Sequence, residues 1–364
     1  MILIADLHSG KESDSFLVQG VPSQRLDLRR RLSEIGSRCR ADGHALVIAG
    51  DVFNRVNPTS EVVAEWFQFL TDNIEVPIYI IPGNHDAGTV TVNLVMVRAA
   101  WFPKTKVFFD PTMEVVSDST GESRVLFYPH LPSSRKDDFA SIDAYCSGVD
   151  FLVTHGQVTD SSYENEIFFE AGNALSIDVA KAQGLIFAGH VHGQGVHTTL
   201  NGGTVVYPGS LTVNNFGEVD ETKGYIEVSL SAPQEYVLKE FDTVVTPWRH
   251  VELDLTEKDE TSIDESLVEE VCEGAVIKIT VIAQRYGIVD ESYIRTLFNK
   301  YGHVTRYETK VVGESVSTET PQKRLSHEKL LGSWLSESGS DAKTIKAANA
   351  LGSDIIADVL SKKG

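Results

Sequence analysis

Short apolar runs recur along the first 240 residues, and each is followed closely by Asp, Gly, Pro or His. Runs of this length, partly β-branched, are typical of buried strands that end in loops. Amphipathic stretches at 24–40 and 59–72 predict helices, the second with Thr59 or Ser60 as its N-cap and Glu61 in its first turn. This alternation predicts an α/β domain. The expected strands are residues 2–5, 45–49, 77–81, 125–128, 151–154 and 185–188.

Helical patterning fades after residue 185, where consecutive strands are predicted at 204–207, 224–230 and 234–241. A strand–helix–strand–helix–strand order follows, and it suits a small α/β domain at 244–312. Its strands are expected at 249–255, 275–282 and 304–312, and its helices at 262–272 and 290–301.

The last part of the chain has a different character. Residues 313–325 begin with the polar stretch GESVSTETPQ, which breaks the periodicity and predicts a linker. Residues 326–364 contain two amphipathic helix candidates, at 326–336 and 342–361. The first domain is therefore expected to cover 1–243, followed by the small domain, the linker and a helical pair.

The composition of the 364 residues, with 41% hydrophobic and 23% charged side chains, is that of an ordinary globular chain. A net charge of −20 excludes a freely basic nucleic-acid binder, so an anionic substrate must be attracted locally by metal ions or by a partner. No apolar run reaches the roughly 18 residues of a membrane span, and the start does not resemble a signal peptide. Three cysteines without a CxxC pair exclude a disulfide scaffold, so we expect a cytoplasmic protein without a membrane segment.

Arginines are concentrated in one segment, residues 25–40, which contains six of them. Such a cluster forms either a solvated helix face or a surface for DNA or a partner, and the sequence leaves both open. Trp66 and Trp101 are expected in the core rather than as platforms for stacking bases.

Five short motifs follow five of the predicted strands. Ligands of open α/β sheets gather beyond the carboxyl ends of strands, so these motifs can converge. Their imidazole, carboxylate and amide groups are suitable donors for divalent ions, and DxH and HxH place two side chains on one side of an extended segment. Each motif alone is common, but five in this order predict a metal site. They are Asp6-Leu7-His8, Gly50-Asp51-Val52-Phe53-Asn54, Gly83-Asn84-His85-Asp86, His155-Gly156 and Gly189-His190-Val191-His192.

The order DLH, GDxF, GNHD, HG and GHVH resembles the calcineurin-like metallophosphoesterase superfamily over about residues 1–240. The resemblance implies a sandwich of two mixed β-sheets flanked by helices, which uses two metal ions to hydrolyse phosphomonoesters or phosphodiesters. By motif, it assigns Asp6, His8, Asp51 and His192 to one ion, and Asp51, Asn84, His155 and His190 to the other.

His85 lies outside this ligand set and resembles the superfamily's general acid, which protonates the departing oxygen. Carboxylates commonly orient imidazoles, so we expect Asp86 to orient His85. A mixed oxygen and nitrogen ligand set without thiolate favours Mn²⁺ over zinc.

Three features point to a branch of the superfamily. The third motif reads Asn-His-Asp, as in the nucleases and phosphodiesterases, and residues 50–59 resemble the "GDxFD…R.PT" stretch of SbcD-type double-strand-break repair nucleases. Asn54 stands where many relatives have His or Asp, and Asn54 and Arg55 are expected to bind substrate. The layout of a small capping domain, a linker and a helical pair also matches that family.

This resemblance implies a Mn²⁺-dependent DNA exonuclease and endonuclease of DNA repair and recombination. It further implies a homodimer that binds an SbcC-type ABC ATPase through residues 326–361.

Two functions other than a nuclease also remain as alternatives. A stand-alone phosphoesterase for small phosphodiesters or phosphomonoesters would not need the amphipathic tail. A non-catalytic interaction protein on a degenerate fold would not need the intact ligand set and His85. A gene for an SbcC-like ATPase beside this one would favour the nuclease over the stand-alone enzyme.

Overall fold

The computed structural model describes residues 1–87, 94–131, 148–156, 184–198, 203–284 and 289–312. Residues Met1–Val311 form one compact unit. The predicted linker and the predicted C-terminal helices fall within 313–364, outside the described residues. Among the described residues, no helix is both long and apolar enough to cross a bilayer.

The first of two six-stranded sheets is mixed. Four of its strands run parallel, and two strands from late in the chain add to one edge in antiparallel pairs. In spatial order the strands are β14 (Tyr236–Glu240), β13 (Gly224–Val228), β1 (Ile2–Ile4), β4 (Leu46–Ala49), β5 (Ile78–Ile81) and β6 (Thr105–Val107).

The second sheet is also mixed, but it has four central parallel strands and an antiparallel strand at each edge. In spatial order the strands are β11 (Gly195–Thr198), β12 (Thr204–Tyr207), β10 (Leu185–Gly189), β9 (Phe151–His155), β8 (Gly121–Tyr128) and β7 (Thr112–Asp118).

The two sheets pack face to face. Alternate residues of β1, together with the residue after it, Ala5, point to opposite sides. Leu3 and Ala5 belong to the core between the sheets, whereas Ile2 and Ile4 face the helices. Strands that are covered on both faces need apolar residues throughout, which explains the continuous runs in the sequence. The predicted sandwich of two mixed sheets is therefore confirmed.

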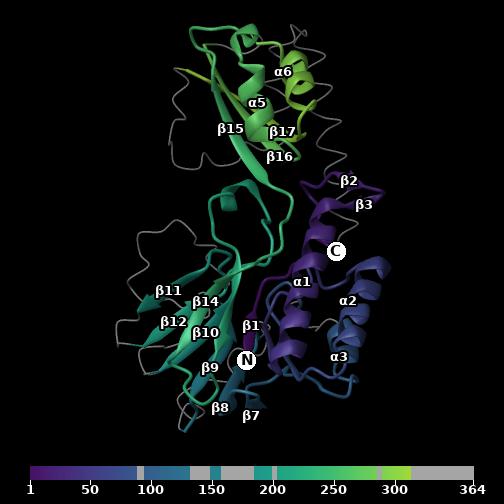
Figure 1. Ribbon diagram of the computed structural model, residues 1–364, viewed down its shortest axis with the longest axis vertical. Coiled ribbons are helices and arrows are strands. Elements are labelled where there is room, and N and C mark those ends of the chain that lie inside the picture. Colours follow the sequence, from purple (N-terminus) through teal and green to yellow (C-terminus); the bar gives the residue numbers. More distant parts are fainter. Residues whose placement is uncertain (88–93, 132–147, 157–183, 199–202, 285–288, 313–364) are drawn as a thin grey trace, which may run out of the picture. The chain divides into compact units, whose positions relative to one another are not determined.

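Helices cover the outer face of the first sheet. They are α1 (Ser23–Asp42), α2 (Ser60–Asp72) and the short α3 (Leu94–Ala99), and Figure 1 shows them together on one side of the strands. Leu28, Leu32 and Ile35 of α1 pack into the same core as Trp66 of α2. The left-handed Gly43 ends α1, as glycine commonly does at a helix C-terminus.

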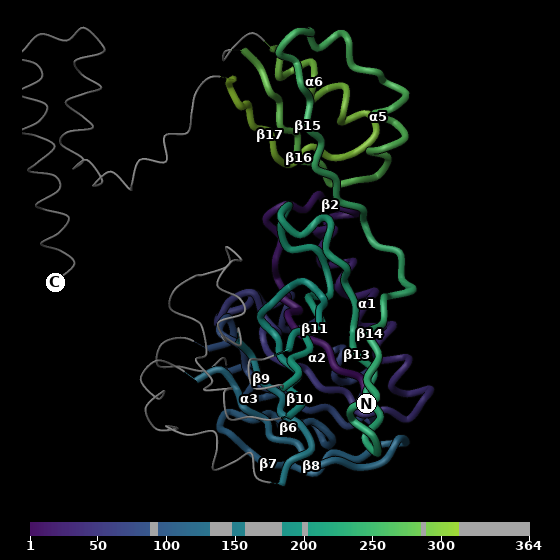
Figure 2. The backbone as a smooth tube through the Cα atoms, turned by 90° about the vertical axis from the view of Figure 1, so that its left-hand side faces the viewer, coloured from purple at the N-terminus to yellow at the C-terminus, as the bar shows by residue number. Residues whose placement is uncertain are grey.

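A separate three-stranded parallel sheet follows, ordered β15 (Trp248–Asp254), β16 (Val276–Ala283) and β17 (His303–Val311). Two helices, α5 (Glu265–Cys272) and α6 (Glu291–Phe298), join these strands and share one apolar core with them (Figure 2). The strand–helix order agrees with the sequence. The boundary near residue 244 stays a prediction.

Among the expected helices, the start of α5 differs most from the sequence prediction. Helix α5 begins three residues later than expected, after a 3₁₀ turn at Glu260–Ser262, because the Asp264 carboxylate caps the amide of Ser266. In the same way, Asp290 caps α6. An aspartate that accepts the first free amides of a helix sets its start more strongly than the apolar pattern does.

The expectation for one tryptophan was wrong. Trp66 is 2% exposed and belongs to the core, whereas Trp101 is 76% exposed after α3 and lies beside the Arg98 guanidinium. Strands β6, β7 and β11 and the short pair β2 (Leu17–Val18) and β3 (Val21–Pro22) were not anticipated. All of them are edge or hairpin strands with partly exposed residues, so they lack a continuous apolar run.

Candidate metal centre

The five motifs meet at the carboxyl ends of β1, β4, β5, β9 and β10. Backbone hydrogen bonds hold the first two motifs side by side, with the amides of Asp6 and His8 bound to the carbonyls of Gly50 and Asp51. The chain therefore continues as paired loops beyond the strands, and the donor groups extend from these loops into one space.

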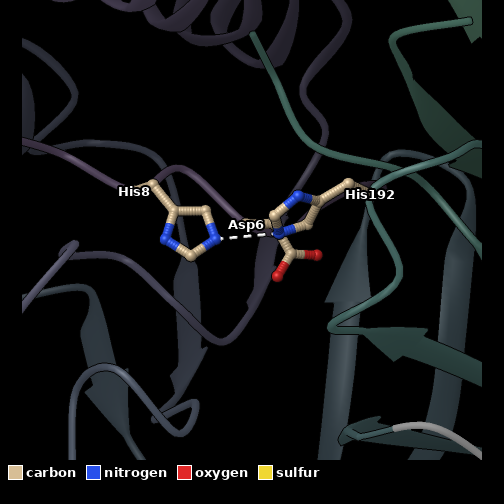
Figure 3. A group of neighbouring side chains, drawn as sticks. All are labelled: Asp6, His8 and His192. Atoms are coloured by element: carbon tan, nitrogen blue, oxygen red, sulfur yellow. Dashed lines mark hydrogen bonds between the residues drawn. The ribbon is translucent and has the colours of Figure 1, made fainter. Parts of the chain in front are cut away.

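One donor group consists of Asp6, His8 and His192, whose ligand atoms lie within 4.8 Å of one another. Figure 3 shows the two rings turning nitrogens toward each other above the Asp6 carboxylate, with Nε2 of His8 3.0 Å from Nε2 of His192. The other ring nitrogen of His8, Nδ1, is buried without a hydrogen-bond partner.

A second group consists of Asn84, His155 and His190. The Asn84 Oδ1 lies 3.0 Å from Nε2 of His155 and 3.1 Å from Nδ1 of His190. The Ala49 carbonyl lies 2.8 Å from Nδ1 of His155 and can only accept, so this nitrogen carries the proton. Nε2 of His155 is therefore the nitrogen that faces the site.

Asp51 lies between the two groups. Its Oδ2 is 3.7 Å from Nε2 of His8 and 3.4 Å from Nε2 of His155, while its Oδ1 accepts the amide of His85 at 2.8 Å. The Asp51 carboxylate therefore approaches both groups, as a bridging ligand must. Asp6 also lies near the second group, because its ligand atom is within 4.8 Å of those of Asp51 and His155.

Two glycines make this crowding possible. A Cβ on Gly50 would overlap the His155 ring, and a Cβ on Gly83 would overlap the Asp51 carboxylate. Gly50 also has a φ of 86°, in the left-handed region. These glycines of the second and third motifs are thus required by the packing of the donor groups.

The loops are strained where the donors sit. Among the described residues, five non-glycine residues have positive φ, and four of them are expected ligands: Asp6, His8, Asp51 and His190. Such backbone costs about 1–2 kcal/mol per residue. Its concentration at one place indicates a functional site.

Burial dominates the electrostatics of Asp6, His8 and His190. It raises the pKa of Asp6 to about 6, although His155 and His192 favour the charged carboxylate. It lowers the pKa of His8 to about 3 and that of His190 to about 4. Both rings are therefore neutral near pH 7, which is the form that binds a cation.

Asp51 and His155 behave as an ion pair. Burial alone would raise the pKa of Asp51 and lower that of His155. Their mutual attraction outweighs burial, so the pKa of Asp51 falls and that of His155 rises to about 10. A cation bound between them must therefore displace the His155 proton.

His85 is exposed at the edge of the site, with its ring edge-on to that of His8 at 4.8 Å between centroids. Its Nδ1 lies 2.9 Å from the carbonyl oxygen of Asn54 and donates to it. The contribution of Asn54 to His85 is thus its backbone, which any residue at this position supplies.

The expectation that Asp86 orients His85 was wrong. The Asp86 carboxylate is fully buried and accepts the amides of Val52, Phe53 and Gly83 at 2.9–3.1 Å. Burial and, less strongly, Asp51 raise its pKa to about 7 although these amides favour the charge. Asp86 therefore ties two motif loops together through their backbones.

Replacing Asp86 by alanine should lower the free energy of unfolding by about 3 kcal/mol, because three buried amides lose their acceptor. Urea unfolding of the metal-free protein, followed by circular dichroism, measures this. Asp42→Ala, a change of an exposed aspartate at the end of α1, is the control. A loss below 1 kcal/mol for Asp86→Ala would contradict the role in joining the loops.

Glu218 and Lys223 also belong to the site, and the sequence did not reveal them. Glu218 Oε1 lies 2.8 Å from Nδ1 of His192, and Lys223 Nζ lies 2.8 Å from Glu218 Oε2. Burial would raise the pKa of Glu218, but His192 and Lys223 outweigh it and lower the pKa to about 2. Glu218 is 26 residues from His192, and no spacing rule connects the two.

Arg55 is not brought into the donor groups. Its side chain is exposed and has no hydrogen-bond or ion-pair partner among the described residues. The arginines of α1, by contrast, are largely used within the fold: Arg25 and Arg29 pair with Glu65, and Arg38 pairs with Glu34 and Asp242. These ion pairs favour the interpretation of the arginine cluster at residues 25–40 as a helix face, and not as a surface for DNA or a partner.

The donor groups fit divalent cations. Two nitrogens bound side by side to one ion at about 2.1 Å are about 3.0–3.4 Å apart, and the facing nitrogens of His8 and His192 are 3.0 Å apart. Imidazoles, buried carboxylates and an amide oxygen form the mixed donor set that Mn²⁺ and Fe²⁺ accept.

The sequence of this chain is similar to that of a known nuclease subunit. The chain is 25% identical over 240 residues to the SbcD component of the SbcCD nuclease of Staphylococcus epidermidis, a match that covers 57% of this chain and 60% of that relative. The chain thus spans less than two thirds of that relative's length.

Two solved structures are similar at 12% identity. A predicted phosphoesterase of Streptococcus pneumoniae aligns over 62% of this chain and 79% of its own, with a TM-score of 0.26. GAP50, the anchor in the inner membrane complex of Plasmodium, aligns over 57% of this chain and 70% of its own, with a TM-score of 0.36. These scores are too low to support an inference.

The family model of the calcineurin-like phosphoesterases matches residues 1–209, more than half of the chain. That range contains all five motifs and both donor groups. By this match, the chain belongs to the calcineurin-like phosphoesterase family.

Proposed function

We propose that this chain is a Mn²⁺-dependent DNA nuclease that hydrolyses phosphodiester bonds as the nuclease subunit of an SbcCD-type complex. The observation that carries the proposal is Asp51, whose carboxylate approaches both donor groups next to the exposed His85. The similarity to a protein named as part of the SbcCD nuclease supports the choice of DNA as substrate.

In this proposal, each donor group holds one divalent cation, and Asp51 is shared. Asp6, His8 and His192 complete one set, and Asn84, His155 and His190 complete the other. When bound, two such cations supply Lewis-acid activation of a phosphate and of an attacking water. Manganese is proposed because the donor set contains no thiolate.

His85 has the role of general acid. With Nδ1 occupied by the Asn54 carbonyl, its Nε2 is the nitrogen that can deliver a proton. As the oxygen of water bonds to phosphorus, the bond from phosphorus to the departing oxygen breaks. That oxygen takes the Nε2 proton of a doubly protonated His85, which leaves a neutral ring, and the attacking water releases its proton to the solvent.

The proposal also covers substrate and partner contacts. Arg55, which is exposed and has no partner in the part of the chain that the structure describes, is available to a phosphate beside the site, and this helps an acidic chain to bind DNA. The amphipathic stretch 326–361 is proposed to dock on an SbcC-type ATPase, and the active form is proposed to be a homodimer.

The substrate is tested with metal-free protein to which MnCl₂ is added. We expect cleavage of short DNA strands, and of duplex ends once the ATPase and ATP are present, with EDTA abolishing both. Efficient turnover of bis(p-nitrophenyl) phosphate without any cleavage of DNA would instead support the stand-alone phosphoesterase. Failure to hydrolyse either substrate would refute the proposal.

The tail is tested by truncation after residue 312. Because 1–312 contains both sheets and all donor residues, we expect Mn²⁺-dependent cleavage of small substrates to stay within about threefold of the full chain. Binding to the ATPase and ATP-dependent degradation of duplex ends should be lost.

The paired change Leu331→Glu and Trp334→Glu in the full chain should have the same effect, because it places two charges on the proposed apolar stripe. Unchanged affinity of the truncated chain for the ATPase would refute the docking role.

A further inference from the structure

A buried carboxylate outside the matched family range contacts the metal centre. Glu218 is 4% exposed and ends the 3₁₀ turn Phe216–Glu218, nine residues beyond the family match at 209. Both of its carboxylate oxygens accept hydrogen bonds. Four nitrogens lie 2.6–3.0 Å from them: Nδ1 of His192, Nδ2 of Asn215, the amide of Asn214 and Nζ of Lys223.

This environment determines the protonation of the His192 ring. A carboxylate only accepts hydrogen bonds, so Nδ1 of His192 must carry a proton and donate to Glu218. In the neutral ring the lone pair is then on Nε2, the nitrogen that faces His8 and the Asp6 carboxylate. The contact therefore fixes both the tautomer and the direction of the ring.

The carboxylate is itself held in place. Lys223 is 8% exposed, and its Nζ lies 2.8–3.1 Å from four acceptors, which belong to Glu218, Ser210, Glu221 and the His192 carbonyl. At the other end of the 3₁₀ turn, the Phe216 ring packs against Trp248, with 4.8 Å between ring centroids. The turn is thus anchored on both sides of Glu218.

We propose that Glu218 is a positioning residue of the metal centre, which holds His192 in the tautomer and orientation that bind a cation through Nε2. The inference rests on the proposed function only in taking His192 as a ligand. Carboxylates that orient ligand histidines in this way typically change metal affinity by about 10–100-fold when they are lost.

The test measures binding of MnCl₂ alone to the full-length, metal-free protein by titration calorimetry. In Glu218→Gln we expect the dissociation constant of the weakened site to rise about 10–100-fold. The amide cannot accept from all four donors, so the ring loses its fixed partner. Glu221→Gln is the matched control: Glu221 also binds Lys223 but has no contact with His192, and its affinity for Mn²⁺ should change less than about twofold.

A double-mutant cycle separates positioning from general damage. If Glu218 acts through His192, then Glu218→Gln should have almost no further effect on Mn²⁺ binding in a His192→Ala background. Equal losses in both backgrounds, or no loss in the wild-type background, would overturn the inference. Should Glu218→Gln not fold, Glu218→Asp serves in the same cycle, since the shorter side chain withdraws the carboxylate from the ring.

These readouts do not depend on DNA cleavage. A wild-type chain that binds Mn²⁺ but cleaves no phosphodiester, together with the expected Glu218 effect, refutes the proposed function and leaves the inference standing. A chain that cleaves DNA but shows no Glu218 effect refutes the inference alone. A wild-type chain that binds no Mn²⁺ refutes both.

Discussion

Replacing Asp51 by asparagine should slow Mn²⁺-dependent hydrolysis of bis(p-nitrophenyl) phosphate by about 10³-fold or more. The Asp51 carboxylate lies 3.7 Å from His8 in one donor group and 3.4 Å from His155 in the other, so removing its charge weakens both cation sites at once. Asparagine has nearly the same size and can still accept the His85 amide, which keeps the loop in place. Steady-state rates over a range of MnCl₂ concentrations measure the loss.

Asp42→Asn makes the same chemical change at an exposed position and should leave the rate unaltered. Thermal unfolding of both variants shows whether the Asp51 variant is folded at the assay temperature. A rate for Asp51→Asn within tenfold of the wild type would mean that the shared carboxylate is not central, and the assignment of the two cation sites would fail.

His85→Ala should slow cleavage of DNA by about 10²–10⁴-fold. The effect should depend on the leaving group. The departing sugar oxygen of DNA needs a proton, whereas p-nitrophenolate is a stable anion that leaves without one. With bis(p-nitrophenyl) phosphate, the same variant should therefore lose far less activity than with DNA.

This comparison tests a specific rival role. Side-chain atoms of His85, His8 and Asp51 lie within 4.8 Å of one another, so His85 is itself placed to bind a cation. Elemental analysis should find as much bound manganese in His85→Ala as in the wild type. Equal slowing with both substrates, accompanied by the loss of one ion per chain, would identify His85 as a ligand.

The central strands could be predicted from sequence because burial on both faces demands an uninterrupted apolar run. β1, β4, β5, β9 and β10 all meet this demand, and each was expected within one residue of its observed bounds. Edge strands such as β7 and β11 are half-exposed, so their sequences carry no such run. Trp101 was misjudged for a related reason: an apolar residue type does not determine which side of a short helix the fold leaves open.

The candidate donors were also predictable, because each directly follows one of those strands in a short motif. Asp6 and His8 of the first motif reach one donor group, whereas His190 and His192 of the fifth motif reach different groups. The carboxyl ends of neighbouring strands then bring the motifs together. Residue types and strand ends were sufficient to predict a cluster, and the fold has that cluster.

By itself, then, the sequence determined the α/β class, the central strands and which side chains gather at their ends, since these follow from local pattern. Only the tertiary structure decided how each donor is held. Asp86 binds amides 33 and 34 residues away, His155 donates to Ala49 across 106 residues, and His192 donates to Glu218 across 26. Such partners are chosen by where the chain returns in space, and a hydrogen bond between distant residues leaves no periodic signal in the sequence.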